Sequence, residues 1–378
     1  MRLFNRGVVG IDISCSQIRF VELRGNINSP VIQNMGSIYV SDEVVKNGKV
    51  INSDKFKAAL EELWKQYKIK SKDIVLGISN SDVIMRFVSL PKMPVSKLSN
   101  FIKFQASDFI PVNIEDYELD YTIVSEGSNE SGPYYNVLLV AARKKMLYEY
   151  INTFLDMNLY IKDIKSSVLV MDNTIPKEYR NGVSVVVNIT PEACNLLIVN
   201  NKLPAFARTI LFGDMMSEKV DVLLNYKSRT HGDKIISDKH ELNHLLKYSH
   251  YEKATLNSTV EFSNGNIAVL EKEDVHEIDI DDIANDIVSF IGGEIASSIS
   301  YFQSQNRELT INKIFLLGGS CFDRAIYYGL AKLIGSNAYI LKPYENMFNT
   351  LSKKKNIEDF EPAEYAIALS LAMHGLGG

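Results

Sequence analysis

The sequence predicts an α/β protein built from two similar halves, because one residue pattern occurs twice along the chain. Residues 7–24 read GVVGIDISCSQIRFVELR, and residues 182–200 read GVSVVVNITPEACNLLIVN. Each copy is an apolar strand that ends in an Asp or Asn, an Ile and a hydroxyl residue, followed by a turn and a second apolar strand. This alternation of apolar runs and polar turns indicates two β-hairpins.

Each hairpin begins a longer unit, because a third apolar segment follows it. After the first meander, residues 54–68 show helical spacing, and Asp54 is the expected N-cap. The short apolar run at 74–78 then suits a buried parallel strand. The expected meander strands are 8–13, 18–23, 31–40, 183–189, 194–199 and 205–211. The later elements are expected as helices over 214–226, 281–302 and 362–373 and strands over 314–317 and 338–341.

The order of these elements resembles two ribonuclease-H-like halves side by side, the α/β architecture of actin, Hsp70 and hexokinase. Two segments fall outside the repeat. One has its own strand, helix and strand pair, with an expected loop over 127–133, and the other is polar and weakly periodic. The expected organisation is a first half over 1–81, completed by 144–180 and 345–378, a second half over 181–227, completed by 281–344, and inserted small subdomains over 82–143 and 228–280.

Composition narrows the class of protein. The net charge of −5 and the short basic run Lys353–Lys355 argue against a nucleic-acid-binding protein, which usually presents a basic face. The first residues do not read as a secretory signal, and no stretch approaches the ~18–20 apolar residues that span a bilayer. Cys15, Cys194 and Cys321 match neither a disulfide framework nor a zinc motif. We therefore expect a cytosolic protein that reaches a membrane only through partners.

The first turn is a candidate phosphate site. Asp12 ends the first strand, and Ser14, Cys15, Ser16 and Gln17 follow it. Backbone N–H groups of a tight turn can converge on an anion, and the serine hydroxyls add donors. The carboxylate suits the water shell of a Mg²⁺ ion, which keeps several of its waters when it accompanies ATP. An ordinary hairpin, in which Asp and Ser satisfy turn amides, explains the same residues.

The second turn and a glycine-rich segment extend this candidate site. Asn188 and Thr190 occupy the positions that hold an acid and a serine in the first turn, so the second turn has no negative charge. Gly318, Gly319 and Ser320 follow an apolar run, where glycine lets a backbone lie close to an adenine or ribose. A plain hairpin and an ordinary strand-to-helix turn are the alternatives. The sequence has no P-loop, HExxH or CxxC motif.

With these segments in view, the chain resembles PilM, the actin-like cytoplasmic protein family of type IV pilus assembly, over nearly its whole length. The resemblance is carried by VVGIDISCSQIRFVEL at 8–23 and most specifically by LPKMPVSKLSNFIKFQASDFIPVNIEDYELDY at 90–121. The GGEIASSISYFQSQ helix, the IFLLGGS loop and the EYAIALSLAMHG end are also similar. The cell-division protein FtsA shares the architecture, but the 90–121 stretch fits PilM better.

The resemblance implies an actin-like ATPase fold that binds ATP and Mg²⁺ between its halves, with Asp12 holding the metal through water. It also implies that Gly213, Asp214 and Glu294 belong to the nucleotide site.

This chain departs from the family pattern inside that site. The family usually has glycine where this chain has Ser14 and Thr190, and an acid where it has Asn188. Its usual Gly-Gly before the next helix is Gly213–Asp214 here. We therefore expect a nucleotide-binding protein with weak or no ATPase activity.

The resemblance also implies partners and a location. The N-terminal cytoplasmic segment of PilN, a single-pass membrane protein, is expected in a groove between the first half and the 82–143 subdomain. PilO and the pilus motor components follow indirectly, and the location is cytoplasmic at the inner face of the cell membrane. The apolar and proline residues expected to line the groove are Leu90, Phe104, Ile110, Pro111 and Val112. The same residues equally suit the core of the small subdomain.

Three functions stay open at this point. The chain is a scaffold whose nucleotide sets its conformation, an ATPase whose closure drives a cycle, or an FtsA-like polymerising protein. The missing second acid, and the lack of an obvious general base, favour the scaffold.

Overall fold

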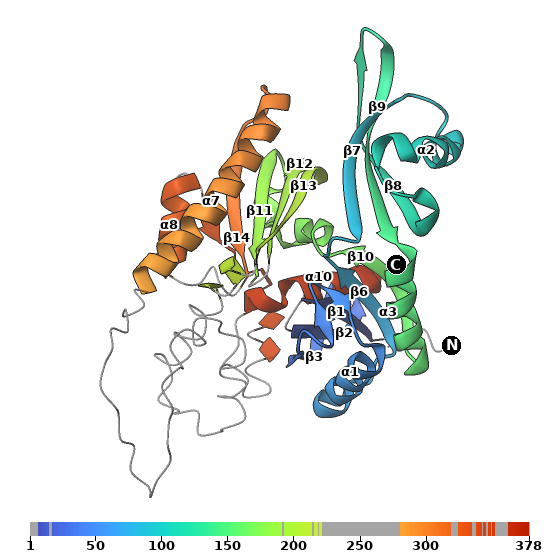
Figure 1. Ribbon diagram of the computed structural model, residues 1–378, viewed down its shortest axis with the longest axis vertical. Coiled ribbons are helices and arrows are strands. Elements are labelled where there is room, and N and C mark those ends of the chain that lie inside the picture. The colour runs from blue at the N-terminus through green and yellow to red at the C-terminus, as the bar shows by residue number, and fades with distance from the viewer. Residues whose placement is uncertain are drawn as a thin grey trace, which may run out of the picture.

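The computed structural model describes residues 7–14, 17–190, 193–213, 215–217, 219–220, 280–318, 324–334, 338–341, 343–344, 347–348, 350–351 and 362–377. These residues form two five-stranded sheets, a three-stranded sheet, a short two-stranded hairpin and the helices that flank them. Figure 1 shows the small sheet projecting from the first half, and the C-terminal helix lying between the two larger sheets.

The first large sheet has the strand order β10-β6-β1-β2-β3. Its elements are β1 Val8–Ile13, β2 Gln17–Asn26, β3 Ser29–Tyr39, β6 Asp73–Ile78 and β10 Tyr160–Ser166, with helices α1 Ser53–Tyr67 and α3 Lys144–Asp156. Strands β1, β2 and β3 form the expected antiparallel meander, and β6 is parallel to β1, as the short apolar run predicts. Helices α1 and α3 cover one face, so the central strands are buried on both sides and need no polar alternation.

The second large sheet repeats the first strand by strand. Its order is β13-β12-β11-β14-β15, so β11 to β13 correspond to β1 to β3, and β14 and β15 correspond to β6 and β10. Its elements are β11 Val183–Ile189, β12 Ala193–Asn200, β13 Leu203–Leu211, β14 Ile311–Leu317 and β15 Ala338–Ile340, with helices α7 Ile280–Gln305 and α8 Arg324–Ile334. The residue pattern that occurs twice in the sequence is therefore a structural repeat.

The two sheets share one hydrophobic core around the C-terminal helix. The elements between them are η2 Leu169–Thr174, η3 Lys177–Tyr179, η5 Pro362–Tyr365 and α10 Ala366–Gly377. One buried cluster joins Val75 of the first sheet, Val186 and Phe315 of the second, and residues of η2 and α10. The approach is close, since a Cβ built on Gly10 of β1 would lie 2.0 Å from the carbonyl oxygen of Ala368 in α10.

The inserted segment forms a separate sheet with the order β7-β9-β8. Its elements are β7 Val83–Pro91, α2 Val95–Phe109, η1 Ile114–Asp116, β8 Tyr117–Asn129 and β9 Gly132–Arg143. Helix α2 packs on one face of this sheet. The loop expected over 127–133 is wrong, because the strands continue to a tight turn between Asn129 and Gly132. The polar residues there are the exposed end of a long hairpin.

Two further details differ from the sequence-based expectation. Helix α1 is capped by Asn52, whose side chain accepts a hydrogen bond from the N–H of Lys55, whereas Asp54 lies inside the first turn. A short hairpin of β4 Val45–Lys46 and β5 Lys49–Val50 precedes the helix and was not expected. The expected polar insert over 228–280 lies outside the described residues apart from its last residue, and so does most of the helix expected over 214–226.

Candidate functional site

Asp12 stands at the end of β1 on the face of the sheet that looks toward α10. Its Oδ1 accepts a hydrogen bond of 2.8 Å from the hydroxyl of Ser167, which follows β10. Across the hairpin, Arg19 of β2 is its direct register partner, so the two side chains share one face. Burial raises the pKa of Asp12, while the hydrogen bond from Ser167 and the positive charge of Arg19 act in the opposite direction.

The first turn is closed by its own polar groups. The N–H and the hydroxyl of Ser14 both donate to the carbonyl of Gln17, at 2.9 and 3.1 Å. The Arg19 guanidinium donates to the Ser14 hydroxyl at 3.4 Å, and its buried Nε has no hydrogen-bond partner among the described residues. The side-chain oxygen of Gln17 is likewise buried without a partner there. The serine is therefore committed to the turn, and Arg19 and Gln17 keep polar atoms for a ligand.

The second turn has the same construction. The N–H and hydroxyl of Thr190 donate to the carbonyl of Ala193 at 2.9 and 3.0 Å, and the Ala193 N–H donates back to that hydroxyl at 3.1 Å. Asn188 pairs across the hairpin with Asn195, in the positions that Asp12 and Arg19 hold in the first half. The first half thus has an acid and a base, Asp12 and Arg19, at the positions where the second half has two neutral amides.

The two halves contact each other where the end of β6 meets the second hairpin. The Ser79 hydroxyl, just beyond β6 of the first half, donates to the side-chain oxygen of Asn195 in the second half at 3.1 Å. The Thr209 hydroxyl donates to the same oxygen at 2.8 Å. Asn188 and Asn195 lie on the same face of their sheet as the residues that pack on α10. The polar ends of both hairpins therefore lie on the α10 side of their sheets, on the side where Ser79 connects the two halves.

Gly318 brings the end of β14 into the same neighbourhood. It has a φ of +100°, a conformation that residues with a Cβ rarely adopt. A Cβ there would lie 2.3 Å from the carbonyl oxygen of Ile189 and 2.8 Å from Oδ1 of Asn188. The residue is consequently in contact with the second turn. Gly319 and Ser320 lie outside the described residues, as do Cys15, Ser16 and Asp214.

Glu294 does not join this set. It lies in the middle of α7, where its carboxylate forms an ion pair of 2.8 Å with Arg208 of β13. Arg208 precedes Thr209 in the same strand, and successive side chains of a strand point to opposite faces. Glu294 is therefore on the α7 side of the second sheet, whereas Asn188 and Asn195 are on the α10 side. Gly213 follows β13, and apart from its chain neighbours no described residue comes within 4 Å of a Cβ built on it.

Several residues of the interface were missed by the sequence analysis. Arg19 was the easiest of these residues to predict from the sequence. It lies seven residues after Asp12, and the same spacing separates Asn188 from Asn195. Aligning the two strands of each hairpin would have paired them. Ser79 and Ser167 carried no such signal, because each reaches the site from another strand of the sheet.

The side chains at the interface fit a magnesium-bound nucleotide in the first half more fully than in the second. Asp12 offers a carboxylate for metal-bound water, and Arg19 offers positive charge for phosphate. Asn188 and Asn195 offer amides without charge. The described residues contain no group of three or more His, Cys, Asp and Glu side chains that could hold a metal directly. Asp12 is the described carboxylate at this interface that would hold a Mg²⁺ ion through water.

The five residues expected to bind a partner separate into core and surface. Leu90 and Ile110 are completely buried in the core of the small sheet, as the alternative of a structural role requires. Phe104 is 89% exposed on α2. Pro111 is exposed, and Val112 is half-buried against the edge of the core. Of these five residues, Phe104, Pro111 and part of Val112 are therefore accessible to a partner.

No described helix has the length and apolar character needed to cross a bilayer.

Comparison with solved structures supports the fold. The chain is similar to a chain of a structure described as the PilM-PilN type IV pilus biogenesis complex, with 19% identity, a TM-score of 0.73 and coverage of 98% of this chain and 99% of that one. Weaker likenesses are the ethanolamine utilization protein EutJ from Carboxydothermus hydrogenoformans, with 8% identity, a TM-score of 0.46 and coverage of 97% and 89%, and ADP-bound MreB5 of Spiroplasma citri, with 10% identity, a TM-score of 0.44 and coverage of 94% and 99%. None of the curated proteins compared with the chain matches it.

The actin-like fold expected from the repeated pattern is confirmed. A family model described as type IV pilus assembly protein PilM matches residues 10–229. This match spans more than half of the chain, and it includes both hairpins, the small sheet and the beginning of the second half. The chain therefore belongs to the PilM family of type IV pilus assembly proteins.

Proposed function

We propose that this chain is a nucleotide-binding scaffold of the type IV pilus assembly platform, located in the cytoplasm at the inner face of the membrane. ATP is held between the two halves, and a membrane-anchored partner is held by the small subdomain. The observation that carries the nucleotide part is the contact between the two halves beside the polar hairpin ends, where Ser79, just beyond β6, donates a hydrogen bond to Asn195 of the second hairpin. Asp12 and Arg19 lie at the end of the hairpin on the first-half side of that interface.

The charge distribution supports binding with little turnover. The triphosphate of ATP carries several negative charges, and a hydrolytic transition state needs additional positive charge or hydrogen-bond donors around it. Arg19 supplies one cation, whereas Asn188 and Asn195 supply none. Asn188 also cannot accept a proton, so the second half offers no base at the position equivalent to Asp12. A nucleotide bound here would stabilise a conformation more than it would be consumed.

The proposed partner is the N-terminal cytoplasmic segment of PilN. Support comes from family membership, from the similar fold of a PilM-PilN complex, and from the exposed side chain of Phe104 on the small subdomain. Exposed aromatic residues are frequent anchors of protein interfaces. The same partner would account for a membrane location in a chain whose described helices do not span a bilayer. PilO and the motor components would be reached through PilN.

The experiment that tests the nucleotide part is calorimetric titration of the purified chain with ATP and Mg²⁺. Arg19→Met should weaken ATP binding about 10- to 100-fold, because a charge-assisted hydrogen bond contributes ~1.5–3 kcal/mol. Arg86→Met is the matched control, since Arg86 is an exposed arginine of the small sheet. The ATP affinity of this variant should equal that of the unmodified chain. Phosphate release should stay at the level of the Asp12→Ala variant.

Two outcomes would contradict this function. If ATP and Mg²⁺ give no binding heat and no rise in melting temperature, the interface is not a nucleotide site. If phosphate release by the unmodified chain clearly exceeds that of Asp12→Ala, the chain is an ATPase and the scaffold reading fails.

A further inference from the structure

The small subdomain is joined to the first half by a narrow neck. The chain enters the subdomain after Asp82 and leaves it at Arg143, where α3 begins. The two crossings are tied together, because the N–H of Arg143 donates to the carbonyl of Asp82 at 3.0 Å. At the base of α3, the Lys144 ammonium donates to the carbonyl of Glu115 in η1 at 2.9 Å. Two strands alone would leave such a subdomain free to tilt.

A third chain segment reaches this neck from the first half. It is the tight turn between β4 and β5, formed by Asn47 and Gly48 with φ values of 50° and 66°. Positive φ at both central residues is the signature of the type I′ turn, for which Asn-Gly is the preferred sequence. Gly48 is close to the link between β6 and β7, since a Cβ on it would lie 3.0 Å from the carbonyl oxygen of Ser79 and 3.3 Å from the Cβ of Asn80.

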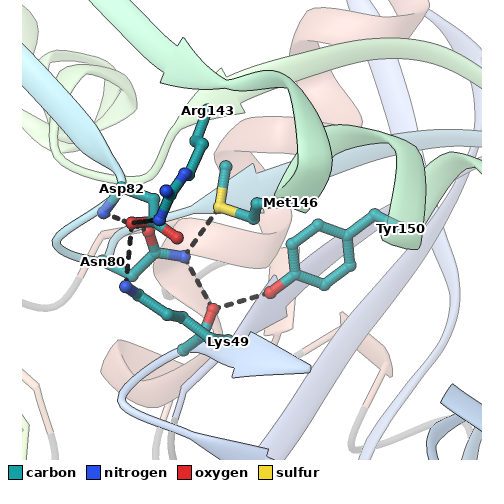
Figure 2. Close-up of polar contacts among 7 residues, drawn as sticks. Lys49, Asn80, Asp82, Arg143, Met146 and Tyr150 are labelled. Atoms are coloured by element: carbon teal, nitrogen blue, oxygen red, sulfur yellow. Dashed lines mark hydrogen bonds and ion pairs between the residues drawn. The ribbon is translucent and has the colours of Figure 1, made fainter. Parts of the chain in front are cut away.

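The carbonyl of Gly48 is held from both sides of the neck, as Figure 2 shows. Asn80, in the link that leads from β6 into β7, donates its amide N–H to this carbonyl at 2.7 Å. Tyr150, on the leaving helix α3, donates its hydroxyl to the same carbonyl at 2.6 Å. Asn80 is almost fully buried, and its amide nitrogen also lies 3.2 Å from the sulfur of Met146 in α3. These contacts form the buried part of the neck.

The contacts of Asp82 form the more exposed part of the neck. Its carboxylate pairs with Lys49, the residue after the turn, at 2.8 Å, and with the Arg143 guanidinium at 3.8 Å. Its backbone N–H donates to the side-chain oxygen of Asn80 at 2.9 Å. The Asp82 side chain is 14% exposed and that of Lys49 is 32% exposed. One carboxylate therefore connects the β4–β5 hairpin to both crossings of the neck.

We propose that the Asn47–Gly48 turn and Asp82 act as a lock that fixes the tilt of the small subdomain against the first half. Three segments that are far apart in sequence converge on one carbonyl and one carboxylate, and any tilt of the subdomain changes both sets of distances. The Gly48 carbonyl contacts are buried and hold the turn in place. The ion pair of Lys49 with Asp82 is at the water boundary, so it is the part that can open without unfolding the neck. Asp82 and Lys49 are positioning residues, and this role does not depend on the proposed nucleotide or partner.

The test is a pulsed electron–electron distance measurement on the full chain without ligands. Spin labels are placed at Glu61→Cys on α1 and Glu130→Cys at the tip of the β8–β9 hairpin, both exposed, after the three native cysteines are replaced by alanine. The unmodified neck should give one narrow distance distribution. Lys49→Met and Asp82→Asn should each broaden it and shift its mean, and the double variant should do no more than either alone.

The controls separate orientation from general loss of structure. Lys49→Arg keeps the ion pair and should restore the narrow distribution. Lys55→Met removes the exposed ion pair of Lys55 with Glu43 in the same half, away from the neck, and should change nothing. Melting temperatures should hardly move for Lys49→Met, because an ion pair at the water boundary contributes little to stability. If Lys49→Met is folded and keeps the narrow distribution of the unmodified chain, the lock does not exist.

Discussion

Asp12 is a carboxylate in a place where burial disfavours its charge. The hydrogen bond from Ser167 and the neighbouring Arg19 offset part of that cost, yet its pKa remains raised. The equivalent position in the second half is Asn188, an amide of nearly the same shape that carries no charge. The repeat thus contains its own comparison, and it indicates that the fold of the hairpin does not require an acid at this position.

This comparison leads to a prediction about pH and stability. Because the pKa of Asp12 is higher in the folded chain than in the unfolded chain, the folded state binds more protons between those two pKa values. The free energy of unfolding contributed by this group therefore falls as the pH rises through that interval. Without ligand, Asp12→Asn should raise the free energy of unfolding at pH 7 by about 1 kcal/mol, the order of one imperfectly paired buried polar group.

Denaturant melts of the unmodified chain and the variant, recorded from pH 8 downward, check this prediction. The advantage of Asp12→Asn should shrink as the pH falls through the raised pKa of Asp12. Asp108→Asn, at an exposed position of α2, is the control and should show no such trend. A variant that is less stable than the unmodified chain at pH 7 would show that the carboxylate supports the fold.

At the scale of elements, α10 depends on the absence of a side chain in β1. A Cβ on Gly10 would lie 2.0 Å from the carbonyl oxygen of Ala368 and 2.5 Å from the backbone nitrogen of Ala372, and both are parts of a helix that cannot step aside alone. Gly10→Val should therefore move α10 and lower the free energy of unfolding by about 1–3 kcal/mol or more.

Thermal and denaturant unfolding measure this loss. The control is Gly293→Ala in α7, because outside the backbone of its own helix and its chain neighbours no described residue comes within 4 Å of a Cβ at that position. It should be neutral or stabilising by about 0.5–1 kcal/mol, since alanine favours the helix over glycine. Equal melting temperatures for Gly10→Val and the unmodified chain would mean that α10 is not seated against β1 as described.

The elements that the sequence predicts well are those whose pattern is local. Strands buried on both faces read as continuous apolar runs, and the amphipathic helix α7 keeps its period over its whole length, so both were found. The β8–β9 hairpin was read as a loop over 127–133 because its far end has no buried face to impose alternation. The choice between Asn52 and Asp54 as the cap was not decided by residue type, because both are good caps.

The residues of the candidate site also divide into those with a local sequence pattern and those without one. Asp12, Asn188 and the two turns could be found from the repeat, because each lies at a fixed place in a hairpin. Ser79 and Ser167 could not, because they meet the hairpins only through the parallel pairing of β6 with β1 and β10. Glu294 was assigned through resemblance alone, and the sheet separates it from the interface.

At the scale of the whole molecule, the small subdomain carries Phe104, the most exposed large apolar side chain of the described residues. Its core holds Leu90 and Ile110, whereas Phe104 projects from α2 into solvent. If PilN binds here, Phe104→Ala should weaken binding of a labelled synthetic peptide with the PilN N-terminal sequence about tenfold or more, the usual cost at an aromatic anchor. Fluorescence anisotropy of that peptide measures the affinity.

Val95→Ala is the matched control for this titration. Val95 is also a well-exposed apolar residue of α2, but it lies nine residues before Phe104, on the opposite side of the helix. Its variant should bind the peptide normally. The same affinity for Phe104→Ala and Val95→Ala would exclude this face of α2 as the binding surface, even if the peptide binds elsewhere on the chain.

The link between β6 and β7 has a mechanical consequence. Its four residues, Ser79 to Asp82, carry the hydrogen bond to the opposite half at one end and the ion pair with Lys49 at the other. A link of four residues spans at most ~14 Å even when fully extended, so its two ends can move very little relative to each other. The 13-residue strand β8 beyond it is a rod of about 40 Å. A rotation of about 10° at its base would sweep the far tip through roughly 7 Å, so a small shift between the lobes would become a large displacement at the outer end of the molecule.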